Sequence, residues 1–375
     1  MSVSTAKAAL ERLLAPADVE INGDRPWDIK VNDVRVYQRV LTKGSLAVGE
    51  SYMDGWWECD KLEELITRVF RLQIDRKFRF KWADVRLYFR ELLFNMQSPK
   101  RSKKVILEHY DLGNDLFFTF LDPYRQYTCA YFKDTEDLGK AQINKLELIC
   151  KKLYLKPGDK VLDIGCGFGG LAKFMSEHYG CEVTGVSISK EQLSFAKDFC
   201  KGLPVNFVNR DYRHFIEYGK FDKIVSVGMF EAVGFKNFRQ FMEVVEKNLK
   251  ENGLFLLHTM GSPITMKSIE PWVDKYIFPN GMLPSISQIG KAIEGLFVME
   301  DWHNFGYYYY KTLMAWFKNF ESNWHMIKGK YDQRFYRMWK FYLLSFAAIF
   351  QSRKDQLWQI VLSKRGVEGG YKSFR

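Results

Sequence analysis

A glycine-rich turn directly after a short apolar strand constrains this 375-residue chain more than any other feature. Residues 161–170 read Val-Leu-Asp-Ile-Gly-Cys-Gly-Phe-Gly-Gly and are followed by a predicted helix over 171–179. Glycine has no Cβ, so it adopts positive φ and lets a ligand lie against backbone amides at a helix N-terminus. The segment therefore predicts a loop that binds a nucleotide-containing cofactor. Its glycines are Gly165, Gly167, Gly169 and Gly170.

The flanking residues separate three kinds of loop. A phosphate-binding P-loop requires Lys and Ser or Thr after the last glycine, where this chain has Leu171 and Ala172. A dinucleotide site requires an acid at the end of the second strand, and the strand expected at 181–186 is followed by Ser187. Asp163, two residues before the first glycine, instead resembles the first motif of class I S-adenosylmethionine (SAM) methyltransferases. There the acid faces the cationic amino-acid end of the cofactor. A loop that only packs a helix against a strand stays an alternative.

Strand and helix patterns alternate after the loop, which predicts an α/β fold with a parallel sheet covered on both faces. Seven strands suit the class I methyltransferase fold. They are expected at 160–164, 182–186, 205–208, 223–227, 254–258, 298–302 and 357–362. Two segments exceed ordinary connections, one at 261–289 and a helical one at 313–350. Because ligands bind beyond the carboxyl ends of such strands, we expect both insertions to cover the substrate.

The chain divides into a small N-terminal domain at 1–95, a basic linker at 96–106 and a catalytic domain at 107–375. Between residues 68 and 94, Lys and Arg alternate with Phe, Trp and Leu. Such a stretch is typical of a protein at an anionic phospholipid surface, where each basic residue contributes about 1 kcal/mol. The alternative is a solvated helix face beside a core face. The net charge of +11 favours an anionic partner without identifying it.

Cysteine usage and hydropathy exclude several classes of protein. The six cysteines contain no C-x-x-C pair, which argues against a disulfide framework and against a zinc site, so no metal is expected. The first 14 residues read as a short polar helix, and no 18 consecutive apolar residues occur. We therefore expect a cytoplasmic protein that is neither exported nor membrane-spanning. RNA binding is compatible with the charge, but no stacking and phosphate-binding module is found.

Seven motifs in order along the chain resemble the cyclopropane-fatty-acyl-phospholipid synthase family, which includes the mycolic acid cyclopropane synthases. The resemblance covers nearly the whole chain, including the N-terminal domain of the longer bacterial members. The motifs are His-Tyr-Asp-Leu-Gly-Asn-Asp at 109–115, Tyr-Thr-Cys at 127–129, Leu-Asp-Ile-Gly-Cys-Gly at 162–167, Val-Gly-Met-Phe-Glu at 227–231, Leu-Leu-His-Thr at 256–259, Pro-Trp-Val-Asp-Lys-Tyr-Ile-Phe-Pro-Asn-Gly at 271–281 and Glu-Asp-Trp-His-Asn-Phe-Gly at 300–306.

The resemblance implies transfer of the SAM methyl to a cis double bond in an acyl chain of a membrane phospholipid, followed by proton loss and ring closure. It implies a bicarbonate ion as the base, held by the side chains of Glu231, His258 and Tyr309 and by backbone groups of Cys129 and Met260. It also implies peripheral attachment to the inner face of the cell membrane, and we expect a homodimer formed through the N-terminal domain. The implied cofactor residues are Tyr127, Thr128, Asp163, Gly165, Gly167, Gly169, Ser187, Ser189, Gln192, Asp211 and Tyr212.

Two positions depart from the family pattern. Many members carry His after the motif glutamate, where this chain has Ala232, and a cysteine in the C-terminal helical segment is Phe346 here. A nucleophilic cysteine is therefore disfavoured. The aromatic rings of Phe230 and of residues 307–310 are candidates for stabilising the carbocation that forms on the acyl chain. The alternatives are an enzyme that adds a methyl, hydroxyl or methoxy branch, an RNA methyltransferase, and a non-catalytic membrane scaffold.

Overall fold

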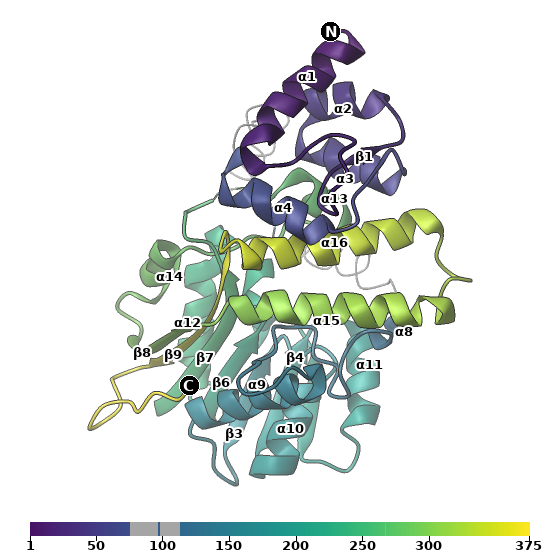
Figure 1. The fold of residues 1–375 in the computed structure, drawn as a ribbon. Helices are drawn as coiled ribbons and strands as arrows, with labels where there is room; N and C mark the ends of the chain where they lie inside the picture. The colour runs from purple at the N-terminus through teal and green to yellow at the C-terminus, as the bar shows by residue number, and fades with distance from the viewer. Residues whose placement is uncertain (76–96, 98–112, 267) are drawn as a thin grey trace. The chain divides into compact units, whose positions relative to one another are not determined.

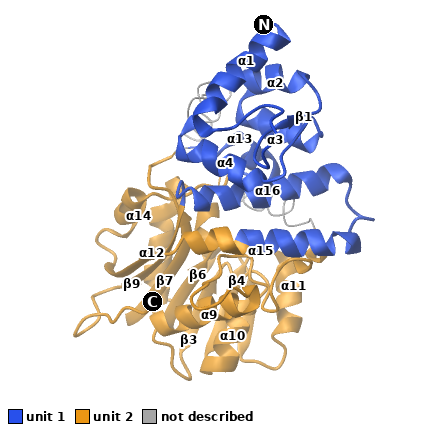
Figure 2. Ribbon diagram, in the orientation of Figure 1, with its two compact units in different colours: residues 1–95, 267–279, 313–355 blue, residues 96–266, 280–312, 356–375 orange. Residues whose placement is uncertain are grey.

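The computed structural model describes residues 1–75, 97, 113–266 and 268–375. Most of the basic stretch at 68–94, most of the expected linker and the first four residues of the motif at 109–115 therefore lie outside the described residues. The chain forms two compact units (Figure 2). The first contains residues 1–95, 267–279 and 313–355, and the second contains residues 96–266, 280–312 and 356–375.

The first unit is mainly helical (Figure 1), and it contains one two-stranded antiparallel sheet. Its N-terminal elements are α1 (Val3–Leu14), β1 (Lys30–Val31), α2 (Arg35–Lys43), α3 (Ser45–Met53), β2 (Trp57–Glu58) and α4 (Leu62–Arg71). Later in the chain come α13 (Pro271–Tyr276), the second part of α15 (Tyr307–Asn323) and α16 (Gln333–Gln351). The expected N-terminal helix is confirmed. None of the helices in the described part of the chain is both long and apolar enough to cross a bilayer.

Aromatic packing explains why residues 267–279 and 313–355 belong to the same unit as the N-terminal segment. The Trp272 ring lies against Gly49, where a Cβ would come within 2.4 Å of Cδ1. The same ring packs edge-on against Phe341, with centroids 4.8 Å apart, and Phe341 contacts Tyr52 at 5.4 Å. The Lys275 ammonium pairs with the Glu50 carboxylate at 2.6 Å. Both segments fall within the catalytic domain that the sequence analysis drew at 107–375, so the compact units do not follow that sequence boundary.

The second unit is built on a seven-stranded sheet with the strand order β5-β4-β3-β6-β7-β9-β8. The strands are β3 (Lys160–Ile164), β4 (Glu182–Ser187), β5 (Val205–Asn209), β6 (Phe221–Val227), β7 (Leu249–Gly261), β8 (Val298–Asn304) and β9 (Gln356–Ser363). All seven expected strands are confirmed, most of them extended by one or more residues. The sheet is parallel from β5 to β7, as expected, whereas β9 runs antiparallel to both β7 and β8. No helix separates α16 from β9, so the chain returns to the sheet directly.

Helices cover both faces of this sheet, and neighbouring residues of each strand alternate between the two faces. On one face, Val161 packs in a core with residues of α9 (Leu138–Lys152), α10 (Gly170–Tyr179) and α11 (Lys190–Phe199). On the other, Leu162 packs with α12 (Phe238–Asn248) and α14 (Ile286–Ile293). By this alternation Asp163, which follows Leu162, lies on the α9 face. His258 lies there too, because its neighbour Leu257 belongs to the α12 core.

Gly170 marks the closest backbone approach in the unit. A Cβ at this position would lie 1.8 Å from the carbonyl oxygen of Tyr124, and backbone cannot yield as a side-chain end can. We expect Gly170→Ala to lower the free energy of unfolding by about 1–3 kcal/mol, the usual cost of overpacking. Gly290→Ala in α14 is the control, since nothing lies within 4 Å and alanine favours helix by up to about 1 kcal/mol. Thermal unfolding of both variants measures the difference; equal melting temperatures would contradict this packing.

Candidate active site

Several of the sequence-predicted site residues lie at or just beyond the carboxyl ends of β3, β4, β6 and β7 in the second unit. The glycine loop follows β3, and Ser187 ends β4. Glu231 lies in the short helix η3 (Phe230–Ala232) after β6, and Met260 lies near the end of β7. Because these strands are parallel neighbours, their carboxyl ends meet at one edge, where open α/β sheets bind their ligands.

The glycine loop is shaped for close approach of a ligand. Gly165 has φ +85°, and a Cβ there would lie 2.6 Å from the Met229 side chain. Gly167 has φ +52° and nothing within 4 Å of its ideal Cβ position, so this part of the loop borders open space. Gly169, with φ +80°, caps the N-terminus of α10 and packs against Phe207. Gly165 and Gly169 are therefore packed against neighbouring side chains, whereas Gly167 borders open space that a ligand can occupy.

Asp163 is the buried acid of the loop. Its side chain is 2% exposed, and Oδ2 has no hydrogen-bond partner among the described residues. Burial raises the pKa of the Asp163 carboxyl to about 7, and the nearby Lys145 ammonium opposes that rise. A buried carboxylate with a free oxygen attracts a cation. These properties fit the ammonium end of SAM, which the sequence analysis assigned to Asp163.

The segment that carries Tyr127, Thr128 and Cys129 is fixed by two side chains of α9. Lys145 Nζ donates to Gln126 Oε1 at 2.5 Å and to Thr128 Oγ1 at 2.9 Å. Gln142 Nε2 donates to the Thr128 carbonyl at 2.9 Å. Lys145 is fully buried, which lowers the pKa of its ammonium to about 8. Lys145 and Gln142 were not predicted from the sequence. They could have been noticed as two long polar residues on the apolar face of α9, beside Ala141 and Leu146.

The remaining predicted cofactor residues have distinct environments. Ser189 caps α11 by accepting from the Gln192 amide at 3.3 Å. The Asp211 carboxylate is already engaged by Arg213 at 2.6 Å, and its hydrogen bonds from Arg213 keep the pKa below its usual range despite burial. The Tyr212 hydroxyl is buried without a partner among the described residues. Asp211 is therefore bound to Arg213, whereas the Tyr212 hydroxyl is available to a ligand.

Glu231 and Met260 are in direct contact. Met260 N donates to Glu231 Oε1 at 2.6 Å, and the Met282 amide donates to the Glu231 carbonyl at 2.7 Å. Glu231 Oε2 is buried and has no partner among the described residues. Burial raises the pKa of the Glu231 carboxyl above its usual value. One carboxylate oxygen is thus fixed by the protein and the other is free for a ligand.

His258, two residues before Met260 on β7, is 1% exposed. Its Nδ1 lies 3.3 Å from Gln359 Nε2, and its Nε2 has no partner in the described part of the chain. Burial, together with the charges of Lys145 and Lys152, holds the pKa of His258 well below its usual value, so the imidazole is neutral. A buried neutral imidazole with a free nitrogen is a hydrogen-bonding group for a ligand and not a cation.

The segment that carries Cys129 is hydrogen-bonded to the first turns of α15, which carry Tyr309. Thr312 Oγ1 accepts from the Ala130 amide at 3.0 Å and donates to the Tyr308 carbonyl at 2.7 Å, which joins the two segments. Tyr309, in the same turn, is 9% exposed. Ring contacts of Phe305 with His258, at 5.9 Å, and with Tyr131, at 5.2 Å, link this part of the site to β7. The structure therefore brings the five implied anion-site residues onto adjoining elements of one unit.

The two departures from the family pattern lie on different elements. Ala232 is exposed on η3, next to the buried Glu231. Phe346 belongs to α16 of the first unit and packs against Tyr342 and Phe278. All six cysteines are buried, and burial raises the pKa of the Cys129 thiol far above its usual value, so it stays protonated. No group of three His, Cys, Asp or Glu side chains gathers as metal ligands among the residues the structure describes.

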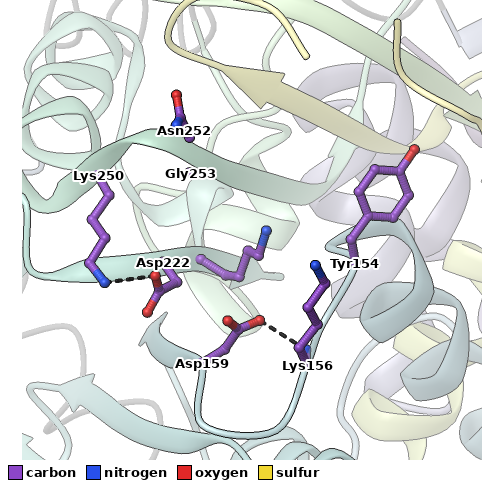
Figure 3. A pocket seen from close by; sticks show the side chains of 8 residues that line it. Tyr154, Lys156, Asp159, Asp222, Lys250, Asn252 and Gly253 are labelled. Atoms are coloured by element: carbon purple, nitrogen blue, oxygen red, sulfur yellow. Dashed lines mark hydrogen bonds and ion pairs between the residues drawn. The ribbon is translucent and has the colours of Figure 1, made fainter. Parts of the chain in front are cut away.

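A polar pocket lies at the other end of the sheet, beside the amino ends of β3 and β6 (Figure 3). Lys250 Nζ forms an ion pair with Asp222 at 2.7 Å, and Asp159 accepts a hydrogen bond from the backbone amide of Lys156 at 2.9 Å. None of the residues that line this pocket contributes to the buried polar atoms that lack a partner in the described part of the chain. It is separate from the residues described above.

Comparisons with known proteins agree on one group of relatives. The family model described as mycolic acid cyclopropane synthetase matches residues 97–360. The chain is 51% identical to the cyclopropane-fatty-acyl-phospholipid synthase of Escherichia coli over 363 residues, which covers 97% of this chain and 94% of that protein. It is 36% identical to a probable fatty acid methyltransferase of Pseudomonas putida, covering 71% of this chain and 70% of the relative.

Solved structures give the same picture. The cyclopropane synthase MmaA2 of Mycobacterium tuberculosis matches with a TM-score of 0.65 and 28% identity, over 70% of this chain and 98% of the other. The mycolic acid cyclopropane synthase CmaA1, solved with SAH and CTAB, matches with the same TM-score, identity and coverage. Coclaurine N-methyltransferase, at 18% identity and a TM-score of 0.71 over 84% of this chain and 99% of that one, shares the fold. The expected class I methyltransferase fold is thereby confirmed.

Proposed function

Because this chain belongs to the mycolic acid cyclopropane synthetase family of SAM-dependent methyltransferases, we propose that it converts cis double bonds in phospholipid acyl chains into cyclopropane rings. The observation that carries the proposal concerns two buried atoms, Glu231 Oε2 and His258 Nε2, at the same sheet edge as the Asp163 loop. Neither atom has a hydrogen-bond partner among the described residues. Asp163 fits the positively charged methyl donor, and Glu231 with His258 fits an anionic base that acts next to that donor.

The reaction balances with one methyl and one proton. The methyl carbon leaves the SAM sulfur and bonds to one alkene carbon, which leaves a cation on the acyl chain and the neutral thioether of the donor. Loss of a proton from the added methyl closes the ring. An alkene is a weak nucleophile, so alignment with the methyl group supplies much of the rate. Phe230 stacks on Phe238 in the core beneath α12, with ring centroids 4.4 Å apart. Of the expected aromatic residues, we therefore propose those at 307–310 to stabilise the cation, by roughly 0.5–2 kcal/mol each.

Bicarbonate is the proposed proton acceptor. Bound next to Glu231, it would supply a base, since burial disfavours the charged forms of Glu231 and His258. The residues present fit such an ion. Glu231 Oε2 can accept its O–H, and His258 Nε2 can donate to its oxygens. Backbone groups of Cys129 and Met260 and the Tyr309 side chain are proposed as further contacts. The hydrogen bond from Met260 N to Glu231 Oε1, at 2.6 Å, fixes the carboxylate, so we propose that Glu231 positions the ion through Oε2.

Ring formation is preferred over methyl branching on the extent of the matches. The 51% identical synthase covers 97% of this chain, including the N-terminal segment. A sphingolipid C9-methyltransferase of Emericella nidulans is 32% identical and covers 77% of this chain and 60% of that relative. The N-terminal segment is thus matched by a protein named for ring formation.

Mass spectrometry of acyl chains tests the proposal directly. Purified protein is incubated with vesicles of cis-unsaturated phospholipid and with SAM carrying a trideuterated methyl group. Gain of one carbon with two deuterium atoms retained is the expected result, because ring closure removes one of the three. Retention of all three deuterium atoms would establish a methyl branch instead. An unchanged lipid would contradict the substrate assignment and direct attention to amine or RNA acceptors.

The partners of the enzyme are part of the same proposal. A phospholipid acyl chain must be reached at a bilayer, so we propose peripheral action at an anionic inner membrane surface. Arg68 and Arg71, the described basic residues of the stretch at 68–94, lie in the last turn of α4, and Arg68 is paired with Glu64 at 2.8 Å. Partition to anionic vesicles tests the docking, and light scattering tests the proposed homodimer.

A further inference from the structure

Gln359 is a buried polar residue to which the proposed chemistry gives no role so far. It lies in β9 with 0% exposure, paired with His258 of β7 on one side and with His303 of β8 on the other. Residues paired across adjacent strands present their side chains on the same face of a sheet. The three side chains therefore form a row on the face covered by α9. A polar side chain inside this core needs a physical reason, because its burial costs free energy.

The contact of Gln359 with His258 determines where the imidazole carries its proton. Gln359 Nε2 lies 3.3 Å from His258 Nδ1. With the amide in this orientation its nitrogen donates, so Nδ1 accepts. A neutral imidazole has one acceptor nitrogen and one N–H, and the nitrogen that carries the proton is set by the bond made by the other. With Nδ1 accepting, the proton of neutral His258 lies on Nε2.

The charges around His258 favour the neutral ring on which this reasoning depends. His258 is 1% exposed, and Lys145 and Lys152 are both fully buried in the same unit. Lys152 is itself 3.2 Å from His303 Nδ1 and 3.2 Å from the Asp301 carboxylate. Two buried ammonium groups, together with burial, disfavour a third positive charge on the imidazole.

We infer that Gln359 is a positioning residue that holds His258 in the Nε2–H tautomer and thereby presents an N–H donor to the anion site. The inference rests on the proposed function for the identity of the anion. In this tautomer a donor at His258 and an acceptor at Glu231 Oε2 lie on the same sheet edge, and both atoms are without partners among the described residues. A bicarbonate ion can accept from the first and donate to the second. In the opposite tautomer the lone pair of Nε2 would face the anion and repel it.

Nitrogen NMR of the intact protein reads the tautomer directly. Histidine labelled with ¹⁵N in the imidazole ring gives separate signals for protonated and unprotonated nitrogens, and the chain has six histidines. The signals of His258 are assigned by their loss in His258→Gln. At neutral pH we expect a protonated Nε2 and an unprotonated Nδ1. A protonated Nδ1, or a doubly protonated ring, would overturn the inference whatever the activity of the enzyme.

Gln359→Met tests the functional consequence, because methionine keeps the side-chain length and removes the donor. We expect the apparent KM for bicarbonate to rise about tenfold, in line with one lost hydrogen bond, while the SAM Kd stays unchanged. The spectrum should also show mixed tautomers. Gln356→Met is the matched control: this residue begins the same strand and binds Asn304 and Trp358, away from His258. It should leave both the tautomer and the bicarbonate KM unchanged.

The outcomes separate this inference from the proposed function. An unchanged Nε2–H tautomer in Gln359→Met would assign the tautomer to another contact and overturn the role of Gln359. A raised KM for bicarbonate together with a weaker SAM Kd would indicate a general packing defect, which also contradicts it. If the wild-type enzyme does not respond to bicarbonate, the proposed base fails, and the wild-type and Gln359→Met spectra still decide whether Gln359 sets the His258 tautomer.

Discussion

Replacing Glu231 with Gln is expected to lower kcat on the order of 100-fold, a typical cost of removing one preorganised polar contact from an active site. The amide oxygen can keep the bond from Met260 N, which is 2.6 Å long in the structure. Its NH₂ group then occupies the position of Oε2, which has no partner among the described residues. A donor replaces the acceptor for the O–H of the proposed bicarbonate, so the ion is misplaced. Turnover with saturating SAM measures the effect.

SAM binding is the second measurement on the same variant. The Met260 and Met282 amides donate to Glu231, and no hydrogen bond among the described residues joins it to the glycine loop. The SAM Kd should therefore change by less than about twofold, within the range of surface substitutions. Glu243→Gln on α12 is the matched control, because that carboxylate is exposed and pairs only loosely with Arg239 at 3.2 Å. Unimpaired turnover in Glu231→Gln would exclude the positioning role. A large loss of SAM affinity would move Glu231 into the cofactor site.

Replacing Asp163 with Asn is expected to weaken SAM binding about 100-fold, equivalent to about 2.7 kcal/mol. The buried carboxylate has a free oxygen, and an ionised partner makes the stronger class of hydrogen bond to a cation. The amide has the same shape and no charge, so the fold should be retained. Asp159→Asn, just before the opposite end of β3, is the control, since its carboxylate accepts from the Lys156 amide, away from the glycine loop. Calorimetric titration with SAM compares the two variants; equal affinities would contradict the assignment of Asp163.

The pH dependence of SAM binding follows from the same residue. The pKa of Asp163 is about 7 in the ligand-free protein, so the carboxyl is largely protonated below that pH. A bound cation stabilises the ionised form and lowers this pKa, so binding releases a proton below pH 7. The Kd for SAM should therefore rise as the pH falls, by up to about tenfold per unit. In Asp163→Asn this dependence should disappear; its persistence would assign the titration to another group.

Much of the fold was predictable because it depends on local patterns. Most of the seven strands contain a short apolar run, and β3 (Lys160–Ile164) matches its expected bounds. The direction of β9 was not predictable, because antiparallel pairing with β7 depends on the path of the chain after α16 and not on the residues of the strand. The grouping of residues 267–279 with the N-terminal segment could not be predicted from the sequence for a similar reason. It depends on Trp272 packing against Gly49, more than 200 positions earlier.

The candidate site shows the same division. By itself the sequence determined the class of cofactor, because the acid and the glycines of the loop are adjacent in the chain and act through backbone geometry. The tertiary structure alone identified Lys145, which fixes the segment at 126–128, and Gln359, which contacts His258 from 101 positions away. Hydrogen bonds between distant residues leave no periodic signal in a sequence. Only the paired strands and the packed helix α9 bring these groups within bonding distance and bury them, which gives each one its charge and its role.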